Sequence, residues 1–196
     1  MTVRHEITAA DVLPLAEYRK VRAERRRAIT ALKRVRRLEV GPFATFYFES
    51  FATMLHQVQE MLYIEKGGEA QLPDELAAYN PLIPKGRELV ATVMFEIEDP
   101  GRRARILATL GGVEHTAFIR CAGETIKAEA EDDQERTRAD GKASSVQFVH
   151  FPFTAAQIEA IRRPGAEVIL GFSHANYGHM AVMPESMRAA LAEDFD

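Results

Sequence analysis

The chain has 196 residues, of which 46% are apolar and 28% are charged. This is the balance of an ordinary globular protein, so disordered, collagen-like and disulfide-stapled chains are excluded. The length predicts a single domain over 1–196, with a helix-rich part at 1–86, a sheet-rich part at 87–183 and a C-terminal helix at 184–196.

Cysteine use and the lack of long apolar segments predict the compartment. Cys121 is the only cysteine, so the chain can form no intrachain disulfide and no CxxC metal site. We expect this thiol to be buried and inert, and a single thiol suits a reducing compartment. The first residues lack a signal-peptide core, and the apolar stretches run to about seven residues where a membrane helix needs ~20. We therefore expect a soluble cytoplasmic protein that does not bind a membrane.

Charge is unevenly distributed along the chain. The net charge is −4, yet residues 19–37 hold ten Lys and Arg against one Glu, a net of +9 that leaves −13 for the remainder. One interpretation is a basic stripe for phosphate, RNA or another anion. The other is a solvated helix face that docks on the acidic remainder, on a partner or on a second subunit. The acidic total and the lack of an RNA-binding signature favour the second, so we do not expect nucleic acid as the partner.

The first half of the chain is predicted to be mainly helical. Thr8 and Asp11 have the spacing of an imperfect capping box, and Pro14 suits the first position of a helix. Apolar residues then recur at helical spacing from Tyr18 to Val35, which predicts a long amphipathic helix. The predicted elements are a turn at 8–13, helices at 14–34, 51–65 and 72–79, strands at 38–40 and 43–48, and an extended loop at 80–84.

The second half is predicted to be mainly sheet. Residues 89–98 and 145–153 are apolar on both faces, which is typical of central strands. The predicted elements are strands at 89–98, 113–121, 124–130, 145–153 and 166–173, helices at 100–110, 154–163 and from Pro184 onward, and a polar loop at 131–143. Because strands and helices do not alternate, we predict an α+β fold, with a mainly antiparallel sheet of about 5–7 strands, several helices and a long N-terminal helix.

One segment combines two imidazoles and a phenol within six residues, His174-x-x-Tyr177-x-His179, after the last predicted strand. A loop can point both rings to one place, and imidazole is a ligand for iron and zinc. A structural role is the alternative, because His174 continues the apolar face of its strand. The signatures of common nucleotide-binding, zinc-protease and hydrolase sites are missing from the chain. A metal would need a further ligand, for which the candidates are His150, His115, Glu60 and Glu96.

The predicted helix at 51–65 carries polar residues beside its apolar stripe. Gln57, Glu60 and Ile64 share one of its faces. If another element covers that face, Gln57 and Glu60 are buried polar groups that need partners, and they would mark a site. If the face is open, they are ordinary surface residues.

Six motifs occur in a fixed order along nearly the whole chain: Gly41-Pro42, Phe48-Glu49, Gln57-Val58-Gln59-Glu60-Met61 with Glu65, Tyr79-Asn80-Pro81-Leu82-Ile83-Pro84, Ser145-Val146-x-Phe148 and the His174–His179 segment. Together they resemble the bacterial family called domain of unknown function 3501. Ser50 and Ala175 depart from the family pattern, which has Asn and Pro there, and both changes concern loop geometry. The resemblance implies a bacterial cytoplasmic protein of unassigned activity, whose gene neighbours are rubrerythrin-like and iron–sulfur proteins, and it supplies no catalytic residues.

The leading hypothesis is a metal- or small-ligand-binding accessory of a redox or iron–sulfur system, with iron or zinc as the expected metal. The imidazoles would bind or protonate the ligand, Tyr177 would orient it, and Glu60 would supply charge or a hydrogen bond. The alternatives are a non-enzymatic interaction protein, which forms a homodimer or docks a partner through the basic helix, and a weak RNA or nucleotide binder. The candidate ligand-binding residues are His174, Tyr177, His179, Gln57, Glu60 and Asn80, and the candidate metal ligands are His174, His179, Glu60 and Glu96.

Overall fold

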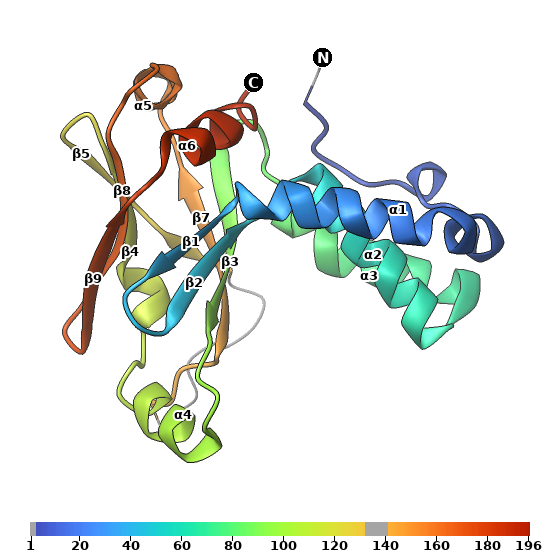
Figure 1. Cartoon of the computed structure of the whole chain (residues 1–196), viewed down its shortest axis with the longest axis horizontal. Helices are drawn as coiled ribbons and strands as arrows, with labels where there is room; N and C mark the ends of the chain where they lie inside the picture. Colours follow the sequence, from blue (N-terminus) through green and yellow to red (C-terminus); the bar gives the residue numbers. More distant parts are fainter. Residues whose placement is uncertain (1–2, 132–140) are drawn as a thin grey trace.

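Two antiparallel β-sheets face each other, and an arm of helices projects from one of them (Figure 1). The computed structural model describes residues 3–131 and 141–196. The α+β class and the long N-terminal helix are confirmed, and the strands divide between two sheets. The first sheet has the order β1 (Arg37–Val40), β2 (Ala44–Phe48), β3 (Glu88–Phe95), β7 (Val146–Pro152), β6 (Glu129–Ala130), and the second the order β5 (Glu124–Lys127), β4 (Ala117–Cys121), β8 (Val168–His174), β9 (Tyr177–Val182).

The larger hydrophobic core fills the space between the two sheets. Alternate residues of each strand point inward, as the two-residue period of a strand requires. The rings of Phe46 on β2 and Phe172 on β8 meet there, with centroids 5.0 Å apart. Helices α5 (Ala155–Arg162) and α6 (Glu185–Ala192) lie at one end of the sheets, and α4 (Pro100–Leu107) lies at the other (Figure 1).

The arm consists of α1 (Leu15–Arg34), α2 (Phe51–Glu65) and α3 (Leu72–Tyr79). It continues the β1–β2 hairpin, because α1 leads into β1 and β2 leads into α2. The Ser50 side chain caps α2 by accepting the N–H of Thr53, so the Ser that departs from the family pattern keeps the cap. The arm has a second, smaller core, formed by Ile7, Met54, Val58, Leu82, Ile83 and Val90.

A buried arginine joins the arm to the sheets. Arg36 lies between α1 and β1 and is 4% exposed. Its guanidinium donates to the carbonyl oxygens of Phe48 and Glu49, 3.1 and 2.9 Å away, and forms an ion pair with Asp194. Because these contacts reach both connections of the arm and the segment after α6, they set the direction in which the arm leaves the sheets.

Several predicted elements differ from the structure. Residues 177–182 form strand β9 instead of a loop, because Ala175 and Asn176 make a tight turn that pairs Tyr177 with His174. Residues 113–116 are a short 3-10 helix, so strand β4 begins only at Ala117. Residues 80–82 are also 3-10, since proline is compatible with a first helical turn. Most of the polar loop predicted at 131–143 lies outside the described residues.

Candidate functional site

Tyr177 is held inside the molecule by the turn between β1 and β2. Its hydroxyl accepts the N–H groups of Phe43 and Ala44, each at 2.9 Å, and donates to the carbonyl of Val40 at 2.8 Å. The side chain is buried, and burial raises the pKa of the phenol. Gly41 allows the hydroxyl to approach the turn this closely. It has φ +71°, and an added Cβ would lie 2.9 Å from the hydroxyl. All the bonding capacity of the phenol is therefore used by its own chain.

The two histidines lie beside Tyr177 on one face of the β8–β9 hairpin. Register pairs His174 with Tyr177 and Phe172 with His179, and paired residues share a face. His174 Nε2 lies 3.3 Å from the carbonyl of Gly111, while its Nδ1 accepts the N–H of Asn176 at 3.1 Å. The ring of His179 packs edge-on against Tyr177, with centroids 4.6 Å apart. The structure therefore places the three predicted side chains on one face of the hairpin, with the rings of Tyr177 and His179 in contact.

The predicted carboxylate ligands lie elsewhere. Glu96 follows β3 on the outer face of the first sheet, where it accepts a hydrogen bond of 2.6 Å from Thr45 and one of 3.2 Å from Tyr47. Glu60 lies in the arm. Within residues 3–131 and 141–196, no group of three His, Cys, Asp or Glu side chains could hold a metal ion. The iron or zinc site stays a prediction, as does the accessory role in a redox system.

Glu60 does lie on a covered face, as one of the two alternatives for α2 predicted. Arg22 of α1 donates two hydrogen bonds of 2.8 Å to the carboxylate, and the hydroxyl of Tyr18 donates a third of 2.6 Å. Chiefly through the bonds from Arg22, the pKa of Glu60 falls to about 2. His56 adjoins this cluster, with Nδ1 3.5 Å from the Tyr18 hydroxyl, and burial lowers its pKa. Since Tyr63 packs against Arg22 with 4.3 Å from guanidinium carbon to ring centroid, the cluster joins α1 to α2 through polar side chains.

Gln57 and Asn80 do not belong to the Glu60 cluster. The amide of Gln57 lies 3.5 Å from the hydroxyl of Tyr79 on α3. The amide of Asn80 bonds to the main chain of Ile7 near the start of the chain. Gln59 makes the same kind of contact with the main chain of Leu13 and is 1% exposed, yet the sequence did not mark it as a site residue. A polar residue on the apolar face of α2 was the signal that could have found it.

The outer side of α1 is open and basic. Tyr18 is the only buried residue of this 20-residue helix. Six side chains spaced along one side of α1 line a shallow hollow of about 530 Å³: Ala23, Arg26, Arg27, Thr30, Ala31 and Arg34. Among the described residues, no carboxylate forms an ion pair with any of these three arginines. None of the helices in the described ranges combines the length and apolar content needed to cross a membrane.

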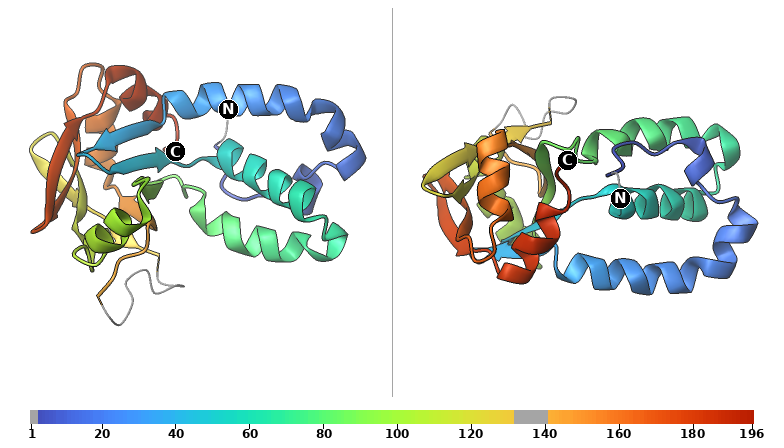
Figure 2. Two further views of the ribbon diagram at one scale, coloured as in Figure 1. Left: turned by 60° about the horizontal axis from the view of Figure 1, so that its bottom comes forward. Right: turned by 90° about the horizontal axis from the view of Figure 1, so that it is seen from above.

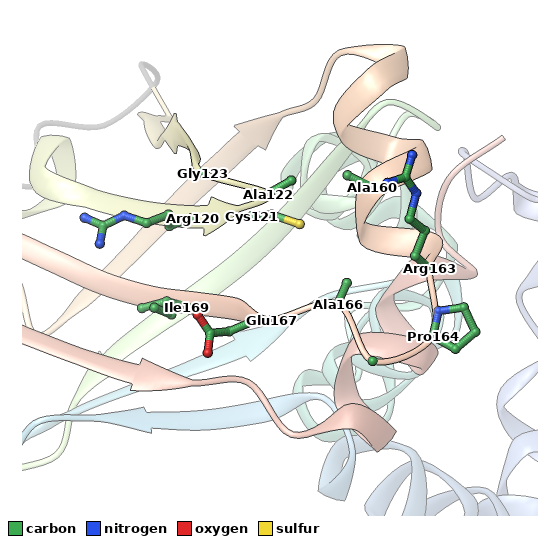
Figure 3. A pocket seen from close by; sticks show the side chains of 11 residues that line it. Arg120, Cys121, Ala122, Gly123, Ala160, Arg163, Pro164, Ala166, Glu167 and Ile169 are labelled. Carbon is green, nitrogen blue, oxygen red and sulfur yellow. The ribbon is translucent and has the colours of Figure 1, made fainter.

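A second hollow of about 530 Å³ lies beside Cys121, between the β4–β5 turn and the loop that follows α5 (Figure 3). The sulfur points toward this space in Figure 3, but the side chain is 2% exposed. Burial raises the pKa of the thiol, so the thiolate is disfavoured. The expectation of a buried, unreactive cysteine agrees with these features.

His150 forms a separate charged cluster on the first sheet. Its ring nitrogens lie 2.9 Å from Glu88 on β3 and 2.5 Å from Glu131, which follows β6. Burial by itself would lower the pKa of His150, but the bonds to the two carboxylates raise it above the ordinary value. The His150 ring therefore links β3, β7 and the end of β6 through its two carboxylate partners.

Comparison with known proteins places the chain in a family. A family model described as a protein of unknown function, DUF3501, matches residues 6–195. The chain belongs to this family. It is similar to a protein of unknown function from Burkholderia pseudomallei K96243, whose crystal structure at 1.90 Å resolution gives a TM-score of 0.89. The two chains are 34% identical, and the match covers 97% of this chain and 99% of that one. No curated protein matches the chain.

Proposed function

We propose that this DUF3501 protein is an interaction protein without chemistry of its own, which docks an acidic protein partner on the outer side of α1. The observation that carries the proposal is the open basic hollow formed by Arg26, Arg27 and Arg34, with small residues between them. Such a stripe offers charge that complements an acidic partner, and its small residues leave room for the partner's side chains.

The ion pairs of the basic segment leave this surface available. Arg22 forms an ion pair with Glu60 and Arg36 with Asp194, so the charges of these two arginines are neutralised within the chain. In the described part of the chain, Arg26, Arg27 and Arg34 have no such carboxylate, and all three are exposed. Exposed cations without partners strengthen long-range attraction to an acidic surface.

Charge also favours an acidic protein over the other partners. A symmetric pairing of two copies through α1 would bring two equally basic helices together, and like charges at close range repel. Nucleic acid would be repelled by the net charge of −13 on the remainder of the chain. Domains that bind nucleic acid generally have a net basic charge. An acidic helix needs to approach only α1.

The proposal is tested with a fluorescent Glu-rich amphipathic helical peptide and its Lys-rich counterpart. We expect the acidic peptide to bind at about 50 mM salt and to weaken as salt rises, because exposed charges are screened. The variant Arg26→Glu/Arg27→Glu/Arg34→Glu should bind the acidic peptide at least about tenfold more weakly, since rim charges govern attraction.

The matched control carries the same change of charge elsewhere on the surface, as Arg105→Glu/Lys127→Glu/Arg163→Glu. It should keep the affinity of the wild type. Equal losses in both triple variants would reduce the effect to net charge and contradict the proposal. A single-stranded RNA that binds more tightly than the acidic peptide, with the same dependence on the α1 arginines, would replace it with nucleic-acid binding.

A further inference from the structure

Two side-chain amides of the arm form hydrogen bonds with the main chain of the segment before α1, residues 5–13. Asn80 Oδ1 accepts the N–H of Ile7 at 2.8 Å, and its Nδ2 donates to the carbonyl of the same residue at 3.0 Å. Gln59 holds Leu13 in the same way, at 2.9 and 3.0 Å. Each amide therefore satisfies both main-chain groups of one residue, as a neighbouring strand does when a protein binds an extended peptide.

One side chain of the segment anchors it. Ile7 is 1% exposed and belongs to the core of the arm, where it packs with Met54, Val58 and other buried residues. Complete burial of an isoleucine side chain stabilises the position of the segment. Lys85 adds a further contact, as its ammonium donates to the carbonyl of His5 at 2.7 Å. The segment thus supplies a buried anchor while the arm supplies the groups that hold its main chain.

The segment is held in the arm mainly through side-chain contacts. It runs between α2 and α3, whereas α1 lies apart from it (Figure 2, right). Among the described residues, residues 3–7 make no main-chain to main-chain hydrogen bond with another element. Pro14, with φ −52° and ψ 145°, ends the segment directly before α1. The segment, which contains a short 3-10 turn at Ala9–Asp11, can therefore leave the groove without breaking a sheet or any of the helices α1, α2 and α3.

We propose that the groove between α2 and α3 is a peptide-binding site, which residues 5–13 fill as a resident ligand and which the same segment of a second copy of this chain can fill in their place. The second copy is the partner because the groove already fits this chain's own sequence. Exchange of one segment between identical copies keeps every contact of the groove and changes only the connection at Pro14.

The resident segment holds an advantage because it is tethered. A short tether gives an effective concentration in the millimolar range, so a segment from another molecule competes poorly in the wild type. Disabling the resident anchor should remove this competition and reveal binding in trans. The proposal is therefore tested with variants that separate the segment from the groove.

Two full-length variants are designed to complement each other. Ile7→Asp disables the segment and leaves the groove intact, because a charge is costly in the apolar core. Gln59→Ala/Asn80→Ala disables the groove and leaves the segment intact. We expect each variant alone to remain monomeric, and an equimolar mixture to form a one-to-one heterodimer of twice the 21.9 kDa chain mass, measured by sedimentation velocity.

A synthetic peptide covering residues 3–14 gives a second measurement on the Ile7→Asp protein. We expect this protein to bind the peptide at least about tenfold more tightly than the wild type, whose site is occupied. The same peptide with Asp in place of Ile7 should not bind. Circular dichroism verifies that the arm helices remain, and if Ile7→Asp unfolds them, Ile7→Ala takes its place in both experiments.

Three outcomes would overturn the proposal. If folded variants give no heterodimer and the peptide binds the variant no more tightly than the wild type, the segment is only part of the core. Peptide binding without a heterodimer would overturn exchange between copies. A scrambled peptide that binds as tightly as the native one would overturn the assignment to a second copy. The groove would then recognise the main chain of a peptide whatever its side chains.

Discussion

Replacing Tyr177 by Phe removes a single oxygen atom that serves three main-chain groups. Its hydroxyl accepts the N–H groups of Phe43 and Ala44 and donates to the carbonyl of Val40. The ring would keep its apolar contacts, since phenylalanine has the same shape without the hydroxyl. The effect of Tyr177→Phe is therefore confined to the three hydrogen bonds at the β1–β2 turn.

The magnitude follows from the burial of these groups. Ala44 is 1% exposed, so its N–H would be left buried without an acceptor, while Phe43 is half-buried and water can reach its N–H more readily. An unsatisfied buried group costs about 1–3 kcal/mol, so the substitution should lower the free energy of unfolding by about 2–4 kcal/mol. A tyrosine that served only to orient a bound ligand would cost much less.

Urea unfolding of Tyr177→Phe, compared with the matched variant Tyr47→Phe, provides the assay. The Tyr47 hydroxyl donates to the exposed Glu96 at 3.2 Å on the outer face of the sheet, so its loss should stay within about 0.5 kcal/mol. The dependence on urea should keep its slope in both variants, and the midpoint should fall only for Tyr177→Phe. If the two variants lose equal stability, the anchoring role of Tyr177 is refuted.

Three further predictions concern other parts of the molecule. The folded pKa of Glu60, about 2, lies below its ordinary value of 4.5. Glu60→Gln should therefore lower the free energy of unfolding above pH 4.5. The difference from the wild type, measured by urea unfolding, should vanish as pH falls toward 2. The folded pKa of His150 lies above 6.5, so its stabilisation should be full below pH 6.5 and should be lost as pH rises through the raised pKa; an NMR titration that found a lowered pKa would contradict this. Gly41→Ala should lower the thermal midpoint more than Gly68→Ala, because both have positive φ but only the first would place a Cβ 2.6 Å from a neighbouring ring; equal shifts would show that this contact relaxes freely.

Much of the fold could be predicted because local patterns specified it. The apolar spacing of residues 14–34 and the Ser50 cap predicted α1 and α2 closely. Strand β9 was missed because Tyr177, Gly178 and His179 mix polar and apolar residues, and only the pairing with β8 makes them a strand. The division into two sheets depends on contacts such as Phe46 with Phe172, which lie far apart in the sequence.

The candidate site was predicted less well, because its members depend on which elements pack together. A loop was expected at His174, Tyr177 and His179, and the structure instead places these residues on one face of the β8–β9 hairpin. The sequence of α2 alone does not indicate that Glu60 faces Arg22 of α1, so the separation of Glu60 from the histidines could not be predicted. The same holds for Gln59, whose role depends on the path of a segment 46 residues earlier in the chain.

The two proposals concern different sides of the arm, and their failures can be told apart. The basic hollow is lined by α1 alone, whereas the groove is formed by α2, α3 and the 3-10 turn that carries Asn80. Reversing the charges of Arg26, Arg27 and Arg34 leaves the groove contacts untouched, so the complementation between segment and groove variants should survive in that background. Loss of both activities together would mean that α1 and the groove are coupled through the polar cluster at Glu60, which is the contact that joins α1 to α2.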